Sequence, residues 1–173
     1  LGNAGVCTYG ELATMSVEKW KEMMDIDLTG VWMSARAAAG PMIEAGNGGS
    51  MIFTSSTAGL RNLNSIGHYV AAKHGLEGLS KVAALEGASH GVTSNCVSPG
   101  YVRTPFTEKQ IGDQARLHEL RPDEVLDRIM LADMAIKRLI EPGEVASLVG
   151  WLVGEHASMV TGASFTMDGG WTT

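Results

Sequence analysis

The sequence predicts an α/β fold in which a parallel sheet is flanked by helices. Short apolar segments of strand length alternate with longer segments that carry helical periodicity. Each connection is long enough for a helix to join two parallel strands. Turns rich in glycine or proline separate these segments. The expected strands are Ser50–Thr54, Val92–Val97 and Ser164–Met167, preceded by the end of a strand in Leu1–Gly5.

The carboxyl ends of the expected strands carry polar and turn residues. Three of these ends deliver Asn3, Ser56 and Pro99-Gly100. Ligands of open parallel sheets bind beyond the carboxyl ends of the strands. A functional site is therefore expected at this edge of the sheet.

A first long helix is expected from Val17 to about Ala45. Ser16 is a suitable N-cap, and apolar residues recur at spacings of three and four through the segment. Two carboxylates, Asp25 and Asp27, interrupt the apolar stripe. We therefore expect the helix to bend near Asp25–Leu28.

A second long helix is expected from about Ile66 to Ser89, with Gly91 as its C′ residue. It carries Tyr69 and Lys73. Both long helices have several small residues, which allow another element to approach them closely.

Residues 105–133 form a polar insertion with two helical patterns, Thr107–Leu117 and Pro122–Leu131. Because this insertion follows a turn at the expected site, we predict that residues 105–133 are a movable substrate lid. A last helix is expected at Gly143–Gly154. The chain, residues 1–173, is the size of one domain.

Composition narrows the possible partners. The net charge is −6, and the 13 basic residues are scattered, which argues against nucleic acid or an anionic membrane. The two cysteines, Cys7 and Cys96, have no neighbours at metal-ligand spacing. We therefore expect no bound metal and a reducing, cytoplasmic location.

Tyr69 and Lys73 are four residues apart, so a helix places both side chains on one face. A phenol ionises near pH ~10, and an ammonium group beside it lowers that pKa toward neutrality. A serine hydroxyl nearby would hold a substrate oxygen while a proton moves between that oxygen and the tyrosine. A lone Tyr-x-x-x-Lys spacing often arises by chance, so the assignment depends on the rest of the sequence.

Several motifs, which follow one another along the chain, support the assignment of Tyr69 and Lys73 as an acid-base pair. Ser56 precedes Tyr69 by thirteen residues. The others are Asn3-Ala4-Gly5, Tyr69-x-x-x-Lys73, Asn95-x-Val97-x-Pro99-Gly100-x-Val102-x-Thr104 and Asp168-Gly169-Gly170. Together they span nearly the whole chain, which resembles the short-chain dehydrogenase/reductase family. The resemblance implies the C-terminal part of a doubly wound, Rossmann-type parallel sheet.

The resemblance also implies roles for individual residues. Tyr69 is the expected general acid/base, Lys73 the group that lowers its pKa and binds the nicotinamide ribose, and Ser56 the group that orients the substrate oxygen. The implied cofactor is NAD or NADP, with a slight preference for NAD. Its expected binding residues are Asn3, Ala4, Gly5, Tyr69, Lys73, Pro99, Gly100, Val102 and Thr104.

Two departures from the family pattern matter. The family has an asparagine, acting through its backbone carbonyl in a proton relay, where this chain has Asp27. Asp27 is expected to keep that catalytic role with altered activity, although a simple bend residue is the alternative. The Thr-Gly-x-x-x-Gly-x-Gly turn that binds the pyrophosphate also does not occur. We therefore expect a partial Rossmann-type domain that lacks its first strands, either a fragment or a truncated product.

Within the family, the resemblance is nearest to bacterial 3-hydroxybutyrate dehydrogenases. It implies that Gln110 lies in the lid and helps to bind a substrate carboxylate. The other carboxylate-binding positions hold Ala58, Ile66 and Cys7 in place of His, Lys and Gln. A less charged or bulkier alcohol or ketone is therefore expected, unless Arg61 or Arg103 replaces the missing cation.

The expected function is NAD(P)-dependent interconversion of a secondary alcohol and a ketone. The alternative is a catalytically incompetent family member or fragment that acts only in subunit assembly. In either case the resemblance implies homo-oligomers, dimers or tetramers, formed through the two long helices.

Overall fold

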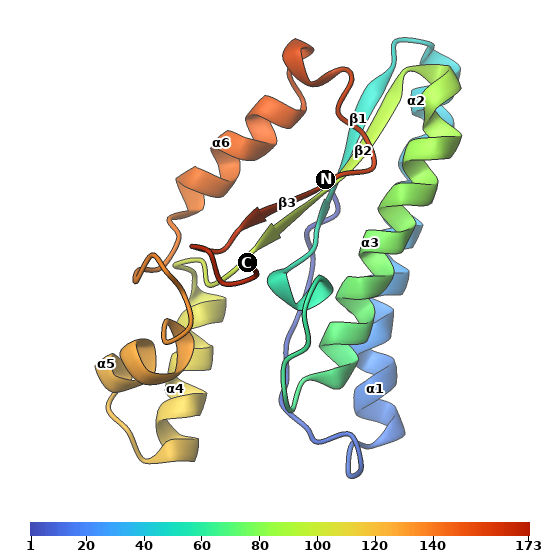
Figure 1. Ribbon diagram of the computed structural model, residues 1–173. Helices are drawn as coiled ribbons and strands as arrows, with labels where there is room; N and C mark the ends of the chain where they lie inside the picture. The colour runs from blue at the N-terminus through green and yellow to red at the C-terminus, as the bar shows by residue number, and fades with distance from the viewer.

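The computed structural model describes residues 1–173 and contains a three-stranded parallel sheet in the order β1-β2-β3 (Figure 1). The strands are β1 (Gly49–Thr54), β2 (Val92–Pro99) and β3 (Ser164–Met167). In the register, Phe53 lies opposite Cys96, and Val97 lies opposite Phe165. The α/β class and the three expected strands are confirmed, with β2 extending two residues further than expected.

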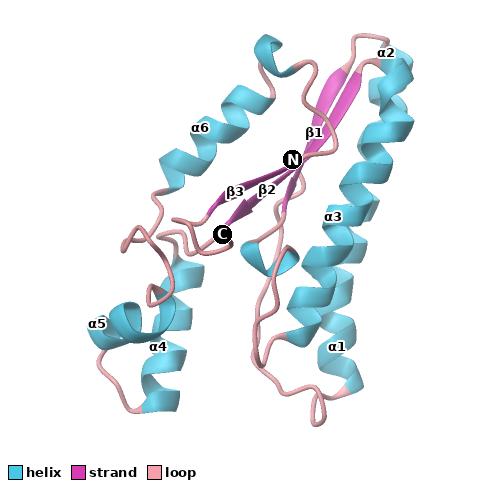
Figure 2. Ribbon diagram, in the orientation of Figure 1, coloured by secondary structure: helices cyan, strands magenta, loops and turns pink.

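Helices cover both faces of the sheet. In Figures 1 and 2, α2 and α3 run together along one face, and α6 lies across the other. The helices are α1 (Val17–Met24), α2 (Gly30–Ala45), α3 (Gly67–Gly87), α4 (Pro105–His118), α5 (Pro122–Val125) and α6 (Pro142–Leu152). Short helical turns occupy Asp25–Thr29, Thr57–Gly59, Ala88–His90, Leu126–Met130 and Glu155–Ala157. None of the helices combines the length and apolar character needed to cross a membrane.

The core lies in two layers because neighbouring strand residues point to opposite faces. Phe53 and Cys96 contact Val31 of α2 and Leu76 of α3 on one face. Ile52 and Val97, one position away along each strand, contact Leu152 of α6 on the other. The sheet is buried on both sides, as is usual for parallel strands.

The first long helix is interrupted at the expected bend. Ser16 caps α1 by accepting a hydrogen bond from the Lys19 N–H at 3.2 Å. The backbone then widens into a π-helical turn at Asp25–Thr29 before α2 begins. The Asp27 side chain in this turn is fully buried. On the charged face of a regular helix it would lie in solvent. α2 continues past Pro41 to its left-handed cap at Gly46.

The expected strand end at Leu1–Gly5 is reduced to a single bridge. Gly2 donates to the Ile52 carbonyl and accepts from the Thr54 N–H, both at 2.8 Å. A Cβ at Gly2 would lie 2.6 Å from a methyl group of Val31. The two hydrogen bonds of Gly2 hold the N-terminal segment against β1, close to the carboxyl edge of the sheet.

The 105–133 insertion is helical, and its second helical segment runs from Pro122 to Met130, close to the expected range. It begins as α5, which spans four residues, and widens into the π turn Leu126–Met130. Beyond this turn, Leu131, Met134 and Leu139 gather around Trp171 near the C-terminus. This apolar cluster joins the end of the insertion to Trp171 and to Leu63 and Tyr101 of the main body.

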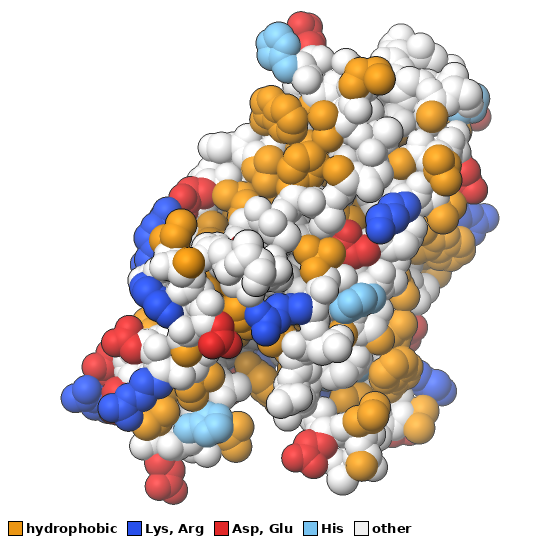
Figure 3. All heavy atoms as spheres, viewed as in Figure 1, with side chains coloured by type: hydrophobic (Ala, Val, Ile, Leu, Met, Phe, Trp, Pro, Cys, Tyr) orange, Lys and Arg blue, Asp and Glu red, His pale blue; other side chains and the backbone are white.

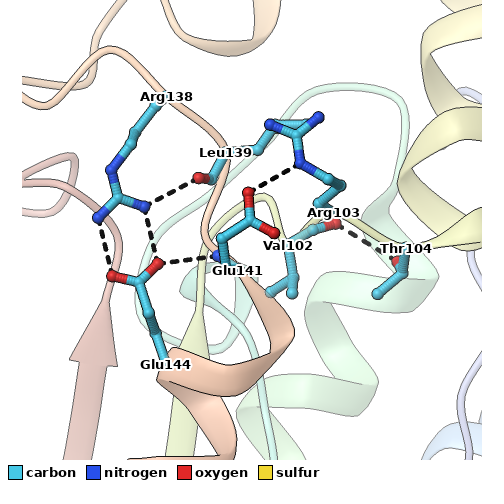
Figure 4. A network of polar contacts seen from close by, with 7 residues as sticks. All are labelled: Val102, Arg103, Thr104, Arg138, Leu139, Glu141 and Glu144. Carbon is cyan, nitrogen blue, oxygen red and sulfur yellow. Dashed lines mark hydrogen bonds and ion pairs between the residues drawn. The ribbon is translucent and has the colours of Figure 1, made fainter.

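A polar network joins the beginning of α4 to the beginning of α6 (Figure 4). Arg103 contacts Glu141 at 2.8 Å, and Arg138 forms a two-pronged pair with Glu144 at 2.7 and 2.8 Å. The Glu144 carboxylate also accepts from the Glu141 backbone N–H at 2.8 Å. These side chains are exposed, so the contacts orient the two helix ends and contribute little stability.

We predict opposite effects from alanine at two glycines of α3. Gly87 faces β2, where a Cβ would lie 2.9 Å from the Val92 carbonyl oxygen. Gly87→Ala should lower the free energy of unfolding by about 1–3 kcal/mol through overpacking. Gly78 has open space around it, so Gly78→Ala should raise that free energy by about 0.5–1 kcal/mol. Urea unfolding of the two variants tests this. Equal effects would contradict the close approach of α3 to β2.

Candidate active site

A cavity of about 600 Å³ opens at the carboxyl ends of β1 and β2. It lies between the body of the molecule and the 105–133 insertion, where the surface in Figure 3 is hollowed. Two of the predicted site residues do not line it: Ala4 is exposed, and Asp27 is buried behind Lys73. The predicted residues that do line it are Asn3, Gly5, Ser56, Ala58, Ile66, Tyr69, Lys73, Pro99, Gly100, Val102, Thr104 and Gln110.

Lys73 lies at the inner end of this cavity. Its ammonium donates to the Thr54 carbonyl at 3.1 Å and lies 5.4 Å from the centre of the Tyr69 ring. Its side chain is only 4% exposed. Burial lowers the pKa of Lys73, and the neighbouring Asp27 carboxylate opposes that shift. The helical spacing that suggested a Tyr–Lys pair is thus realised in three dimensions.

Asp27 connects the π turn to this lysine. One carboxylate oxygen accepts from the Val6 N–H at 2.8 Å, and the other lies 3.4 Å from the Lys73 ammonium. Burial raises the pKa of Asp27, and Lys73 opposes the shift. Gly5 is required here, because a Cβ would lie 2.9 Å from the Asp27 carboxylate.

Tyr69 and Ser56 meet in the cavity from α3 and the end of β1. Burial raises the pKa of Tyr69 above its ordinary value, and the Asp27 carboxylate adds to the increase. A hydrogen bond with the Ser56 side chain acts in the opposite direction. That Lys73 lowers the pKa of the phenol stays a prediction.

The N-terminal segment and the segment after β2 form two further walls. Asn3 accepts a hydrogen bond from the Thr54 hydroxyl at 3.0 Å. Thr104 is the N-cap of α4 and accepts from the Thr107 N–H at 3.4 Å. Its hydroxyl also approaches the Val102 carbonyl, as Figure 4 shows. Backbone and hydroxyl groups thus surround the part of the cavity next to Lys73.

The outer end of the cavity is largely apolar, and the sequence motifs did not reveal this. The Tyr101 and Trp171 rings stack with centroids 5.4 Å apart. Apart from the family motif positions, the lining includes Cys7, Tyr9, Leu63, Tyr101, Phe106 and Trp171. Burial raises the pKa of Cys7 to about 12, so it is a neutral thiol near pH 7. The available signal was the aromatic content of the segments that flank Thr104 and Gly170.

The two arginines proposed as replacement cations are already engaged. The Arg61 guanidinium donates to the Trp171 carbonyl at 2.8 Å and lies 5.0 Å from the centre of its indole ring. Arg103 pairs with Glu141, away from the cavity lining. No three His, Cys, Asp or Glu side chains come close enough together to hold a metal ion.

Comparisons with known proteins agree with this geometry. A family model described as "Enoyl-(Acyl carrier protein) reductase" matches residues 1–172. The chain is 41% identical to D-beta-hydroxybutyrate dehydrogenase of Rhizobium meliloti (strain 1021), covering 99% of this chain and 66% of that protein. It is 38% identical to cyclohexanol dehydrogenase of Acinetobacter sp. (strain SE19), covering 98% and 62%.

A solved structure shows the same arrangement of elements. A variant of actinorhodin polyketide ketoreductase with NADPH superposes with a TM-score of 0.92 and 34% identity, covering 99% of this chain and 66% of that one. The chain belongs to the short-chain dehydrogenase/reductase family. It spans slightly less than two thirds of the length of the curated relatives it matches.

We predict that Lys73→Met destabilises the chain in a pH-dependent way. It leaves the Asp27 carboxylate buried without a cation, which should cost about 3–5 kcal/mol near pH 7. The pKa of Asp27, already raised by burial, should rise further. The folded state then binds a proton more readily than the unfolded state, so the deficit shrinks as pH falls through that raised pKa.

Urea unfolding of the parent, Lys73→Met and Lys73→Met/Asp27→Asn as a function of pH tests this. The double variant has no buried charge left at the two positions and should recover most of the loss at neutral pH. A single variant whose deficit is the same at every pH would contradict the pairing of these residues.

Proposed function

We propose that the protein is an NAD(P)-dependent oxidoreductase that interconverts a secondary alcohol and a ketone. The observation that supports this most directly is the meeting of Tyr69, Lys73 and Ser56 at one cavity on the carboxyl edge of the sheet. Family membership and relatives named as dehydrogenases of small alcohols agree with it. NAD or NADP would supply the hydride acceptor or donor when bound.

Each of the residues at the cavity has its own role in this proposal. Ser56 binds the substrate oxygen, and the Tyr69 hydroxyl exchanges a proton with it. Lys73 holds the ribose side of the nicotinamide. Pro99–Thr104 and Asn3–Gly5 border the same space. Ala4 is exposed and would act through its backbone alone.

Measuring the catalytic activity of the protein in its native sequence context tests this proposal. Ser56→Ala should lower kcat for oxidation of cyclohexanol with NAD or NADP by about 100-fold or more, since the substrate oxygen loses its hydrogen-bond partner. Ser34→Ala is the matched control, because the Ser34 hydroxyl bonds only to the Gly30 carbonyl within its own helix. Undiminished turnover in Ser56→Ala would refute the assigned role.

The outer end of the cavity favours an uncharged substrate. Ile66 and Ala58 are buried apolar residues of the lining, and neither Arg61 nor Arg103 lines the cavity. Gln110 supplies an amide from α4, within hydrogen-bonding reach of Cys7. We therefore assign a neutral or bulkier secondary alcohol or ketone in preference to 3-hydroxybutyrate.

Ile66→Lys should restore a preference for the acid. Adding an ammonium to this wall should raise the ratio of kcat/KM for 3-hydroxybutyrate to that for cyclohexanol by about tenfold. Ile66→Met, similar in length and uncharged, should leave the ratio unchanged. Steady-state kinetics with both substrates measures it. A parent enzyme that already prefers 3-hydroxybutyrate would contradict the assignment of a neutral substrate.

We also propose homo-oligomers formed through α2 and α3. An apolar groove between these helices includes Trp32, Ile43 and Val82, which are 42%, 39% and 50% exposed. Sedimentation equilibrium measures the assembly, and a strictly monomeric protein would exclude it. If NADH and NADPH also fail to raise the melting temperature, assembly without catalysis becomes the better account.

Two further proposals concern setting and motion. Residues 105–133 act as a lid, since they border the cavity through Phe106, Gln110 and Gln114. Cys7 and Cys96 are both free thiols, which supports a cytoplasmic location.

A further inference from the structure

The cation beside the catalytic tyrosine is paired directly with a buried carboxylate. Asp27 and Lys73 are 0% and 4% exposed in their side chains, and their charged atoms are 3.4 Å apart. The Asp27 oxygen that faces Lys73 accepts no hydrogen bond from any other group. The Lys73 ammonium is therefore the polar partner of this Asp27 oxygen.

The net charge of this pair does not depend on where its proton lies. An ionised Asp27 with a protonated Lys73 is neutral, and so is a protonated Asp27 with a neutral Lys73. An asparagine, which the family resemblance leads one to expect at position 27, would leave Lys73 with a full positive charge in the same place.

We propose that Asp27 is a positioning residue that cancels the positive charge of Lys73 toward the Tyr69 hydroxyl. Its Val6 contact fixes the carboxylate from the opposite side, at 2.8 Å, so that it stays in line with the lysine. This inference rests on the proposed function, in which Tyr69 exchanges the proton.

Other titratable groups near the Asp27–Lys73 pair do not replace the positive charge that Asp27 cancels. From the N-terminal segment, Cys7 is a neutral thiol near pH 7. From α3, burial lowers the pKa of His68, whose ring contacts the Thr8 hydroxyl at 2.9 Å. From α1, the Lys19 ammonium is engaged with the Tyr9 carbonyl. Lys109 of α4 is exposed to solvent, which screens its charge.

The consequence is a shift of the working pH range toward alkali. Alcohol oxidation needs the Tyr69 phenolate as base, and a neutral Asp27–Lys73 pair stabilises that phenolate less than a lone ammonium does. Ketone reduction needs the protonated phenol, which the same pair preserves to higher pH. The chain is therefore tuned toward reduction near neutral pH.

Tyrosine titration tests this without cofactor or substrate. The chain has three tyrosines, so protein labelled with ¹³C at the tyrosine ζ-carbon gives three signals, and Tyr69→Phe assigns one. In Asp27→Asn, which keeps an oxygen for the Val6 N–H, the Tyr69 signal should titrate about one pH unit or more lower than in the parent. Asp25→Asn removes an exposed carboxylate of the same π turn and should leave the titration unchanged.

Circular dichroism at each pH shows that the chain is folded, and Asp27→Ser removes the same charge should the amide prevent folding. An equal or higher titration pH in the charge-removing variant would overturn the proposal. So would an equal shift in Asp25→Asn. In the active protein the acid limb of kcat/KM for alcohol oxidation should move down by the same amount. No turnover in the parent protein or in Asp27→Asn, with the titration shift intact, would refute the proposed function and leave this inference standing.

Discussion

The buried ammonium of Lys73 is the point on which the arrangement of this protein depends. It is held between a main-chain carbonyl at the end of β1 and a carboxylate in the π turn. The same carboxylate binds the main chain at Val6. One cation thus joins α3, the sheet edge, the first helical layer and the N-terminal segment. An unpaired charge at this depth would cost several kcal/mol, so these four parts must come together for any of them to be stable there.

Much of the fold could be predicted from the sequence because local signals and global architecture agree. Apolar runs bounded by glycine gave the three strands, and the four-residue spacing of Tyr69 and Lys73 gave the shared helix face. The interruption between α1 and α2 was located but not identified as a π turn, because hydrophobic spacing does not distinguish π from α geometry. The segment Pro122–Met130 was likewise located as helical, but its change from α to π geometry at Leu126 was not foreseen, for the same reason.

The site was predictable in its composition and less so in its electrostatics. The predicted site residues converge on one cavity, with Ala4 and Asp27 as the exceptions in its lining. Spacing alone indicated that Lys73 would lower the pKa of Tyr69. Whether it does depends on burial and on a third charge that comes from a segment more than forty residues away in the chain. Similarly, the engagement of Arg61 with Trp171 joins residues that are 110 positions apart in the sequence, and only the folded chain reveals it.

The π turn at Asp25–Thr29 also bears on how this protein can change over evolutionary time. A π turn behaves as one residue inserted into an α-helix, and it lets α1 and α2 present faces that a continuous helix would not align. Losing one residue there would return the segment to a regular α-helix and remove the bulge that carries Asp27. The contact between the Asp27 carboxylate and Lys73 therefore depends on the one extra residue in this turn.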